Sequence, residues 1–137
     1  MATSTQENHK NHALHNEKVY QFLKQKKEFI DWRVTTSFYA SLHFVEFKLF
    51  PLTTTFAGKK ETFQSIEEFR NFFGEKSKHA ARVRAVKDHL KECRTEYKEL
   101  FDLSMTSRYR HYKFDEPGLV DSKIERCLLK IKESCLK

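Results

Sequence analysis

Hydrophobic residues recur at intervals of three and four from residue 15 onward. In the segment 15–30 the apolar positions are Val19, Phe22, Leu23, Phe29 and Ile30. Because an α-helix has about 3.6 residues per turn, this spacing places the apolar side chains on one face of a helix. Residues 1–14 are mainly polar and lack such a pattern. The sequence therefore predicts a flexible N-terminal tail over 1–14, followed by an amphipathic helix that begins near His15.

The next segment, 31–50, is apolar on nearly every side of its predicted helix. Its hydrophobic residues include Trp32, Phe38, Tyr39, Leu42, Phe44, Val45, Phe47, Leu49 and Phe50. Asp31 can cap the N-terminus, and Pro51 ends the helix because proline lacks the amide that a further turn needs. A helix without a polar face is normally central to a fold or pressed against a second subunit. We expect one of these two positions for it.

A third run of steps of three and four extends over 78–104. The positions that it places on one face are Val83, Val86, Leu90, Cys93, Tyr97, Leu100 and Ser104. This unbroken periodicity predicts one continuous helix, which would be roughly 40 Å long at about 1.5 Å per residue.

Two shorter segments lie between the second and third predicted helices. Residues 51–64 form a connection in which Gly58 marks the expected bend. Ser65 and Glu68 then have the spacing of a capping box, and Gly74 follows two turns later. These signals predict a short helix that begins after Ser65 and ends at Gly74.

The end of the chain carries a second capping box, Ser122 with Glu125, which predicts the start of the last helix. A chain of 137 residues has the usual length of one domain, and its few Gly and Pro residues argue against many short strands. The predicted fold class is all-α, an up-down bundle of four to five helices. We expect one domain over 15–137, in which 51–74 is a connecting insertion.

The net charge of +7 is concentrated in one part of the sequence. Between Lys76 and Lys113 there are eleven Lys or Arg and five Asp or Glu, which is an excess of six positive charges. Such an excess favours polyanionic partners, although a lysine-rich solvated helix has the same composition. No stretch of 18 apolar residues and no signal peptide is present, so the sequence predicts a soluble, cytoplasmic protein without membrane contact.

The cysteines and histidines do not have the spacing of a metal site. The three cysteines lack a Cys-x-x-Cys motif and are odd in number, which predicts reduced, buried thiols: Cys93, Cys127 and Cys135. His9 and His12 lie in the expected tail and His15 directly after it, without a carboxylate or cysteine that would complete a site. The sequence therefore predicts no metal site. It also lacks a Gly-x-Ser-x-Gly motif and a glycine-rich phosphate loop, so no cofactor is expected and classical hydrolases, kinases and dinucleotide-binding enzymes are excluded.

Polar side chains interrupt one face of the second predicted helix. Tyr39, His43 and Glu46 follow at steps of four and three, so they share this face. Buried polar groups need partners, and His79 with Arg82 in the next long helix could supply them. This arrangement is either a polar cleft that binds a ligand or a hydrogen-bond network inside a bundle, and both interpretations remain open.

A second candidate cluster follows the third predicted helix. Arg108 and Arg110 can bind phosphate groups, while Tyr109 and Tyr112 can stack on unpaired bases, with His111 between them. Basic residues after a helix C-terminus also complement the helix dipole. From the residues alone, nucleic-acid binding and helix stabilisation are equally good interpretations.

Three stretches together resemble small bacterial proteins of the HEPN type: "DWRVTTSFYASLHFVEFKL", "KHAARVRAVKDHL" and "YKELFDLSMTSRY". The resemblance covers roughly residues 15–136. The matching positions are Asp31, Trp32, Tyr39, Leu42, His43, Val45, Glu46, His79, Arg82, Tyr97, Leu100, Ser104, Arg108 and Tyr109. It implies a four- or five-helix bundle that forms a homodimer with a cleft between its subunits.

Active HEPN ribonucleases carry an Arg-x4–6-His motif near the start of the last core helix and cleave RNA without a metal. At that place Arg108 precedes His111 by only three residues, and Arg110 has no later His at the required distance. Arg82 and Arg84 have this spacing to His89, but in an earlier helix. The resemblance therefore implies no catalytic residues here, and the chain is not expected to be an enzyme.

Three functions remain open after this comparison. The first is a non-catalytic dimer that binds RNA or a nucleotide through a polar cleft. Its binding residues would be His43, His79, Arg82, Arg108, Tyr109, Arg110 and His111, supported by Tyr39 and Glu46. The second is a divergent, metal-free ribonuclease of the toxin type. The third is a protein-interaction module that pairs with a nucleotidyltransferase, as in a toxin–antitoxin system.

Overall fold

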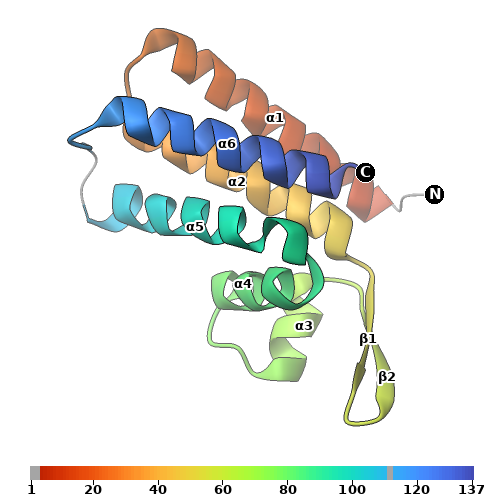
Figure 1. Cartoon of the computed structure of the whole chain (residues 1–137). Helices are drawn as coiled ribbons and strands as arrows, with labels where there is room; N and C mark the ends of the chain where they lie inside the picture. The colour runs from red at the N-terminus through yellow and green to blue at the C-terminus, as the bar shows by residue number, and fades with distance from the viewer. Residues whose placement is uncertain (1–3, 111–112) are drawn as a thin grey trace.

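The computed structural model describes residues 4–110 and 113–137, and this part of the chain is mostly helical (Figure 1). Four long helices lie side by side, each antiparallel to the one before it: α1 (Ser4–Lys26), α2 (Ile30–Leu49), α5 (Arg94–Tyr109) and α6 (Pro117–Cys135). Helix α2 contacts the other three and also α4. The apolar helix expected from the sequence is therefore central to the fold.

A smaller group of elements lies on one side of the long helices, below α5 and the end of α2 in the view (Figure 1). It consists of strands β1 (Leu52–Phe56) and β2 (Lys59–Phe63), helix α3 (Ile66–Phe73) and helix α4 (Lys78–His89). Phenylalanine rings hold the hairpin against α3, with Phe63 5.5 Å from Phe69 and Phe56 5.2 Å from Phe73 between ring centroids. Aromatic contacts of this kind stabilise a group that is too small for a core of its own.

Helix α1 begins at Ser4, so the expected start near His15 is wrong. Residues 4–14 are helical; Ala13 is fully buried and the Gln6 side chain donates a hydrogen bond to the carbonyl of Phe50 at 2.7 Å. The periodicity gave no signal because this part of α1 packs mainly through polar side chains. Residues 1–3 of the predicted tail lie outside the described part of the chain.

The predicted continuous helix over 78–104 is also wrong. Helix α4 ends at His89, Leu90 leaves the helical conformation at φ −131° and ψ 57°, and a short 3₁₀ turn over Lys91–Cys93 leads into α5. Leu90 and Cys93 are both buried. Because the apolar positions face the core on both sides of the bend, the hydrophobic pattern continues through it and does not reveal it.

The connection over 51–64 contains a β-hairpin that the sequence did not predict. Ala57 and Gly58 both have positive φ, 52° and 80°, as the two-residue turn of a tight hairpin requires. The expected bend at Gly58 is confirmed. So is the capping of α3, because the Ser65 hydroxyl accepts a hydrogen bond from the Glu68 amide and Gly74 ends the helix at φ 67°.

The starts of two helices differ from their predicted caps. Helix α6 begins at Pro117 rather than after Ser122, whose hydroxyl donates to the carbonyl of Gly118 within the helix. Proline is favoured at the first helical position because its missing amide has no partner there. Helix α2 begins at Ile30, so Asp31 lies in its first turn and is not its cap.

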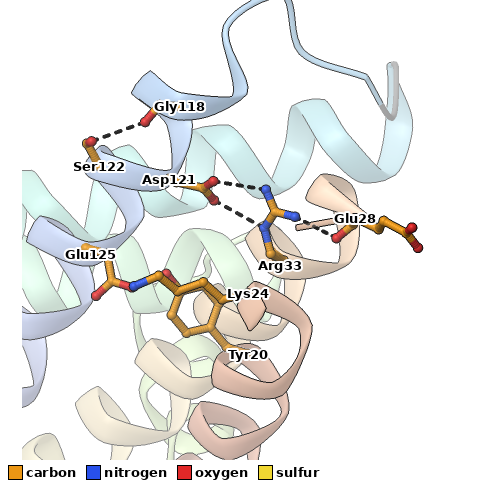
Figure 2. A network of polar contacts seen from close by, with 8 residues as sticks. All are labelled: Tyr20, Lys24, Glu28, Arg33, Gly118, Asp121, Ser122 and Glu125. Atoms are coloured by element: carbon orange, nitrogen blue, oxygen red, sulfur yellow. Dashed lines mark hydrogen bonds and ion pairs between the residues drawn. The ribbon is translucent and has the colours of Figure 1, made fainter. Parts of the chain in front are cut away.

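A buried arginine ties α2 to α6 (Figure 2). The Arg33 side chain donates to both carboxylate oxygens of Asp121, at 3.2 and 3.0 Å, and to the carbonyl of Glu28 at 2.6 Å.

The three cysteines are free and buried, as predicted. Among the described residues, every helix is either too short or too polar to serve as a transmembrane span.

Candidate functional site

The polar face of α2 meets a different element at each of its three side chains. Glu46 contacts Arg82 of α4, Tyr39 contacts Arg108 of α5, and His43 contacts the histidines of α1. The shared face predicted by the spacing is therefore present, and each of its members has a partner.

Glu46 and Arg82 form a buried ion pair at the centre of this region. The Arg82 Nε atom donates to Glu46 Oε1 at 2.7 Å, and the two residues are only 9% and 4% exposed. Removing charges from water is costly, and a short, well-oriented hydrogen bond offsets part of that cost. The contact that the sequence placed between the second and third predicted helices is observed here.

His79 lies next to Arg82 and within electrostatic reach of Arg108. Its Nδ1 is 3.4 Å from Nη1 of Arg82, and its ring is 5.9 Å from that of Phe38 and 5.8 Å from that of Phe101. Burial lowers the pKa of His79, and the positive charges of Arg82 and Arg108 lower it further. The imidazole is therefore neutral at physiological pH.

Arg108 is held against two tyrosine rings. Its Nη1 donates to the Tyr39 hydroxyl at 2.8 Å, and its guanidinium carbon lies 5.4 Å from the centre of that ring. The guanidinium carbon of Arg108 also lies 5.1 Å from the centre of the Tyr109 ring. Such contacts combine cation–π attraction with hydrogen bonding and fix the direction of a flexible arginine side chain.

The surface beside Arg108 carries exposed aromatic rings. Tyr109 is 69% exposed and Trp32 is 57% exposed. Trp32 and Arg108 line a cavity of about 210 Å³ together with Asp31, Thr35 and Ser107. Arg110 is exposed nearby at the end of α5, whereas His111 and Tyr112 lie outside the described residues. Trp32 was expected only as one of the apolar residues of a helix that is central or faces a second subunit, so its exposure beside Arg108 was not predicted.

His43 turns toward α1 rather than toward His79. Its ring stacks on His12 with centroids 3.8 Å apart, and its Nδ1 is 3.1 Å from Nδ1 of His9. Burial lowers the pKa of His43 to about 3, with further lowering from His12, His9 and Arg82. His9 and His12 were expected in the flexible tail, so their position beside this site was not predicted.

The single cleft expected from the sequence is replaced by a filled network with a cavity at each end. The second cavity, of about 310 Å³, is lined by His9, Glu46, Arg82 and Lys78 among other residues. His43 and His79 line neither this cavity nor the one beside Arg108. The arrangement therefore offers a cationic, aromatic surface at one end and a group of nitrogen and carboxylate ligands at the other.

Comparisons with family models, with curated proteins and with solved structures find no match for this chain.

In α4, Arg82 and Arg84 have the spacing of the ribonuclease motif relative to His89, but neither arginine forms a pair with this histidine. The Arg84 guanidinium donates to Glu75 at 3.0 Å and stacks on Phe73, while Arg82 is bound to Glu46. Both arginines therefore hold neighbouring segments of the fold together.

Proposed function

We propose that the protein binds RNA or a nucleotide without cleaving it, at the surface formed by Arg108, Tyr109 and Trp32. The observation that carries this proposal is the contact between the Arg108 guanidinium and the Tyr109 ring, which is 69% exposed. An exposed ring beside a cation can stack on an unpaired base while the cation binds the neighbouring phosphate.

The surroundings of this surface support an anionic, flat ligand. Trp32 offers a second exposed ring next to the cavity that Arg108 lines, and Arg110 adds a further positive charge within two residues. Arg108 is already oriented by Tyr39, so a bound phosphate would not have to fix this side chain from solution. In this proposal Arg110 and His111 are outer phosphate contacts.

The inner residues have a supporting role in the same proposal. Glu46, Arg82 and His79 connect α2 to α4, and the partners of Arg108 on α2 depend on that packing. His43 belongs to the other end of the network. In this proposal Glu46, Arg82 and His79 position the binding surface, and neither they nor His43 contact the ligand directly.

The HEPN-type bundle, the homodimer and a nucleotidyltransferase partner remain predictions from the resemblance. Exposed apolar side chains on α1 and α6, such as Phe22 and Leu129 at 58% each, are available to a second copy of the chain. Light scattering of the purified protein would decide between a monomer and a dimer.

Fluorescence anisotropy with a short, labelled, single-stranded RNA tests the proposed binding. Tyr109→Ala should weaken binding about tenfold, because stacking on one base contributes roughly 1–3 kcal/mol. Arg108→Ala should weaken it as much and should reduce the dependence of affinity on salt, because one phosphate contact is lost.

Arg94→Ala is the matched control, because Arg94 is an exposed arginine at the opposite end of α5. It removes the same charge and should change affinity less than twofold, by roughly 0.4 kcal/mol at most. Equal losses in Arg94→Ala and Arg108→Ala would show that binding follows net charge and not this surface. Shortening of the RNA in the presence of a chelator would replace the proposal with the ribonuclease alternative.

A further inference from the structure

Three potential metal ligands converge where α1 lies against α2. His9 comes from α1, and His43 and Glu46 come from one face of α2. One ligand atom from each residue lies within 4.8 Å of the other two. Nδ1 of His9 is 3.1 Å from Nδ1 of His43 and 3.2 Å from Oε2 of Glu46.

The two separations from His9 Nδ1, 3.1 and 3.2 Å, are those of atoms that share one ion. Zinc binds imidazole nitrogen and carboxylate oxygen at about 2.0–2.2 Å, so two ligands of a tetrahedral site are roughly 3.3 Å apart. Hydrogen bonding accounts less well for the same geometry, because His9 Nδ1 cannot both accept a hydrogen bond from His43 and donate one to Glu46. We propose that His9, His43 and Glu46 form a binding site for a divalent transition-metal ion such as Zn²⁺.

Neighbouring side chains hold the ligands in place. Arg82 binds the other oxygen of Glu46 at 2.7 Å, which leaves Oε2 directed at His9. The His12 ring stacks on His43 at 3.8 Å between centroids and limits its rotation. Such outer contacts orient metal ligands and are a regular part of metal sites in proteins.

The ligand set and its surroundings determine which ions fit. Two imidazoles and one carboxylate suit Zn²⁺, Co²⁺ or Ni²⁺, whereas Mg²⁺ and Ca²⁺ require mainly oxygen ligands. The nearby guanidinium of Arg82 repels cations, so only an ion that binds nitrogen strongly would stay. The site therefore selects against Mg²⁺ and Ca²⁺.

The site has three protein ligands and access to solvent. His9 and Glu46 line the cavity of about 310 Å³, so a water molecule or a small solute can take the fourth position. An ion with three protein ligands and one open position is typical of sites that act on or respond to a bound molecule. This site is separate from the surface around Arg108, so the proposal does not depend on RNA binding.

Isothermal titration calorimetry and native mass spectrometry of the full chain without a histidine tag test the proposal. We expect one Zn²⁺ and one Co²⁺ per chain, with visible absorption of bound Co²⁺ that indicates four ligands, and no binding of Mg²⁺. Absence of Zn²⁺ and Co²⁺ binding would overturn the proposal.

Variants identify the site. His9→Ala and Glu46→Gln should each lower Zn²⁺ affinity roughly tenfold or more, because each removes a ligand or its charge. His15→Ala is the matched control and should leave affinity unchanged, since His15 is an exposed histidine six residues further along α1.

Glu46→Gln keeps an oxygen acceptor for Arg82, and circular dichroism would establish that both variants are folded. Should Glu46→Gln unfold, His9→Ala decides alone, because its side chain is partly exposed near the start of α1. Equal Zn²⁺ affinity in His9→Ala and His15→Ala would refute the assignment, since it would mean that surface histidines bind the ion.

Discussion

Two polar clusters lie at opposite ends of α2, and they differ in how completely their groups are paired. The Arg33 cluster contains Arg33, Asp121, Tyr20 and Glu125 (Figure 2). The nitrogens of the Arg33 guanidinium each donate to an oxygen, two to Asp121 and one to the carbonyl of Glu28. Glu125 accepts from the Tyr20 hydroxyl at 2.6 Å and also binds Lys24.

The His43 cluster contains His9, His12, His43, Glu46 and Arg82, and it is less complete. Its charges are paired, but three imidazoles adjoin one another and compete for the same protons. The nearby Tyr97 hydroxyl, whose charge interactions include Arg82 and Glu46, is buried without a hydrogen-bond partner among the described residues. A complete network fixes the fold, whereas an incomplete one keeps the capacity to bind something else.

The largest expected effect is the loss of the carboxylate that pairs with Arg33. Asp121→Ala leaves the guanidinium of Arg33, which is 3% exposed, without a counter-charge. The free energy of unfolding should fall by about 3 kcal/mol, the usual cost of removing one partner of a buried ion pair. Urea denaturation followed by circular dichroism measures it.

Asp102→Ala is the control for this prediction, because Asp102 pairs with Lys98 on the exposed side of α5. Its loss should cost about 0.5 kcal/mol or less. Similar values for the two variants would mean that the Arg33 cluster does not stabilise the fold more than a surface ion pair does.

Acid should act on His79, the hydrogen-bond neighbour of Arg82 in the His43 cluster, at a higher pH than on the Arg33 cluster. Burial, Arg82 and Arg108 lower the pKa of His79, so the folded state excludes a proton that the unfolded chain binds below pH of about 6.5. The contribution of His79 to stability is therefore fully present above that pH and is lost as the pH decreases toward the pKa of the folded state. His79→Gln should reduce the slope of stability against pH in this range, although His43 contributes to the same slope.

Glu125 acts at lower pH. Burial raises its pKa, but the hydrogen bonds from Lys24 and Tyr20 outweigh this effect, and the net pKa is lowered. Its contribution is present above the unfolded pKa of about 4.3 and is lost as the pH falls through the folded value. Thermal unfolding of Glu125→Gln and His79→Gln across pH would show two separate changes, and a single shared change would contradict the comparison.

Much of the fold could be predicted because burial follows a simple period. The face of α2 that carries Tyr39, His43 and Glu46 was visible in the spacing, and so was its contact with Arg82. The bend at Leu90 was hidden, because a buried residue on each side of it continues the same period. Periodicity reports which side of a segment is buried and not where its axis turns.

The polar clusters were harder to predict because they join residues that are distant in the sequence. Arg33 and Asp121 are 88 positions apart, and neither has a pattern that indicates the other. His9 was missed because the polar composition of residues 4–14 indicated a flexible tail, although the segment packs as a helix. A helix that packs through polar side chains has no hydrophobic periodicity, so sequence patterns do not predict such packing.

The smallest expected effect compares one tyrosine from each region, and the two should change stability in opposite directions. Tyr20 and Tyr97 are both buried, at 0% and 1% exposure. Tyr20→Phe removes the hydrogen bond to Glu125 and should lower the free energy of unfolding by about 1–2 kcal/mol. Tyr97→Phe removes a buried hydroxyl without a partner among the described residues and should raise it by about 1 kcal/mol. Paired urea denaturation curves measure both; if Tyr97→Phe were as destabilising as Tyr20→Phe, the Tyr97 hydroxyl would have a partner such as bound water, and the two clusters would be equally complete.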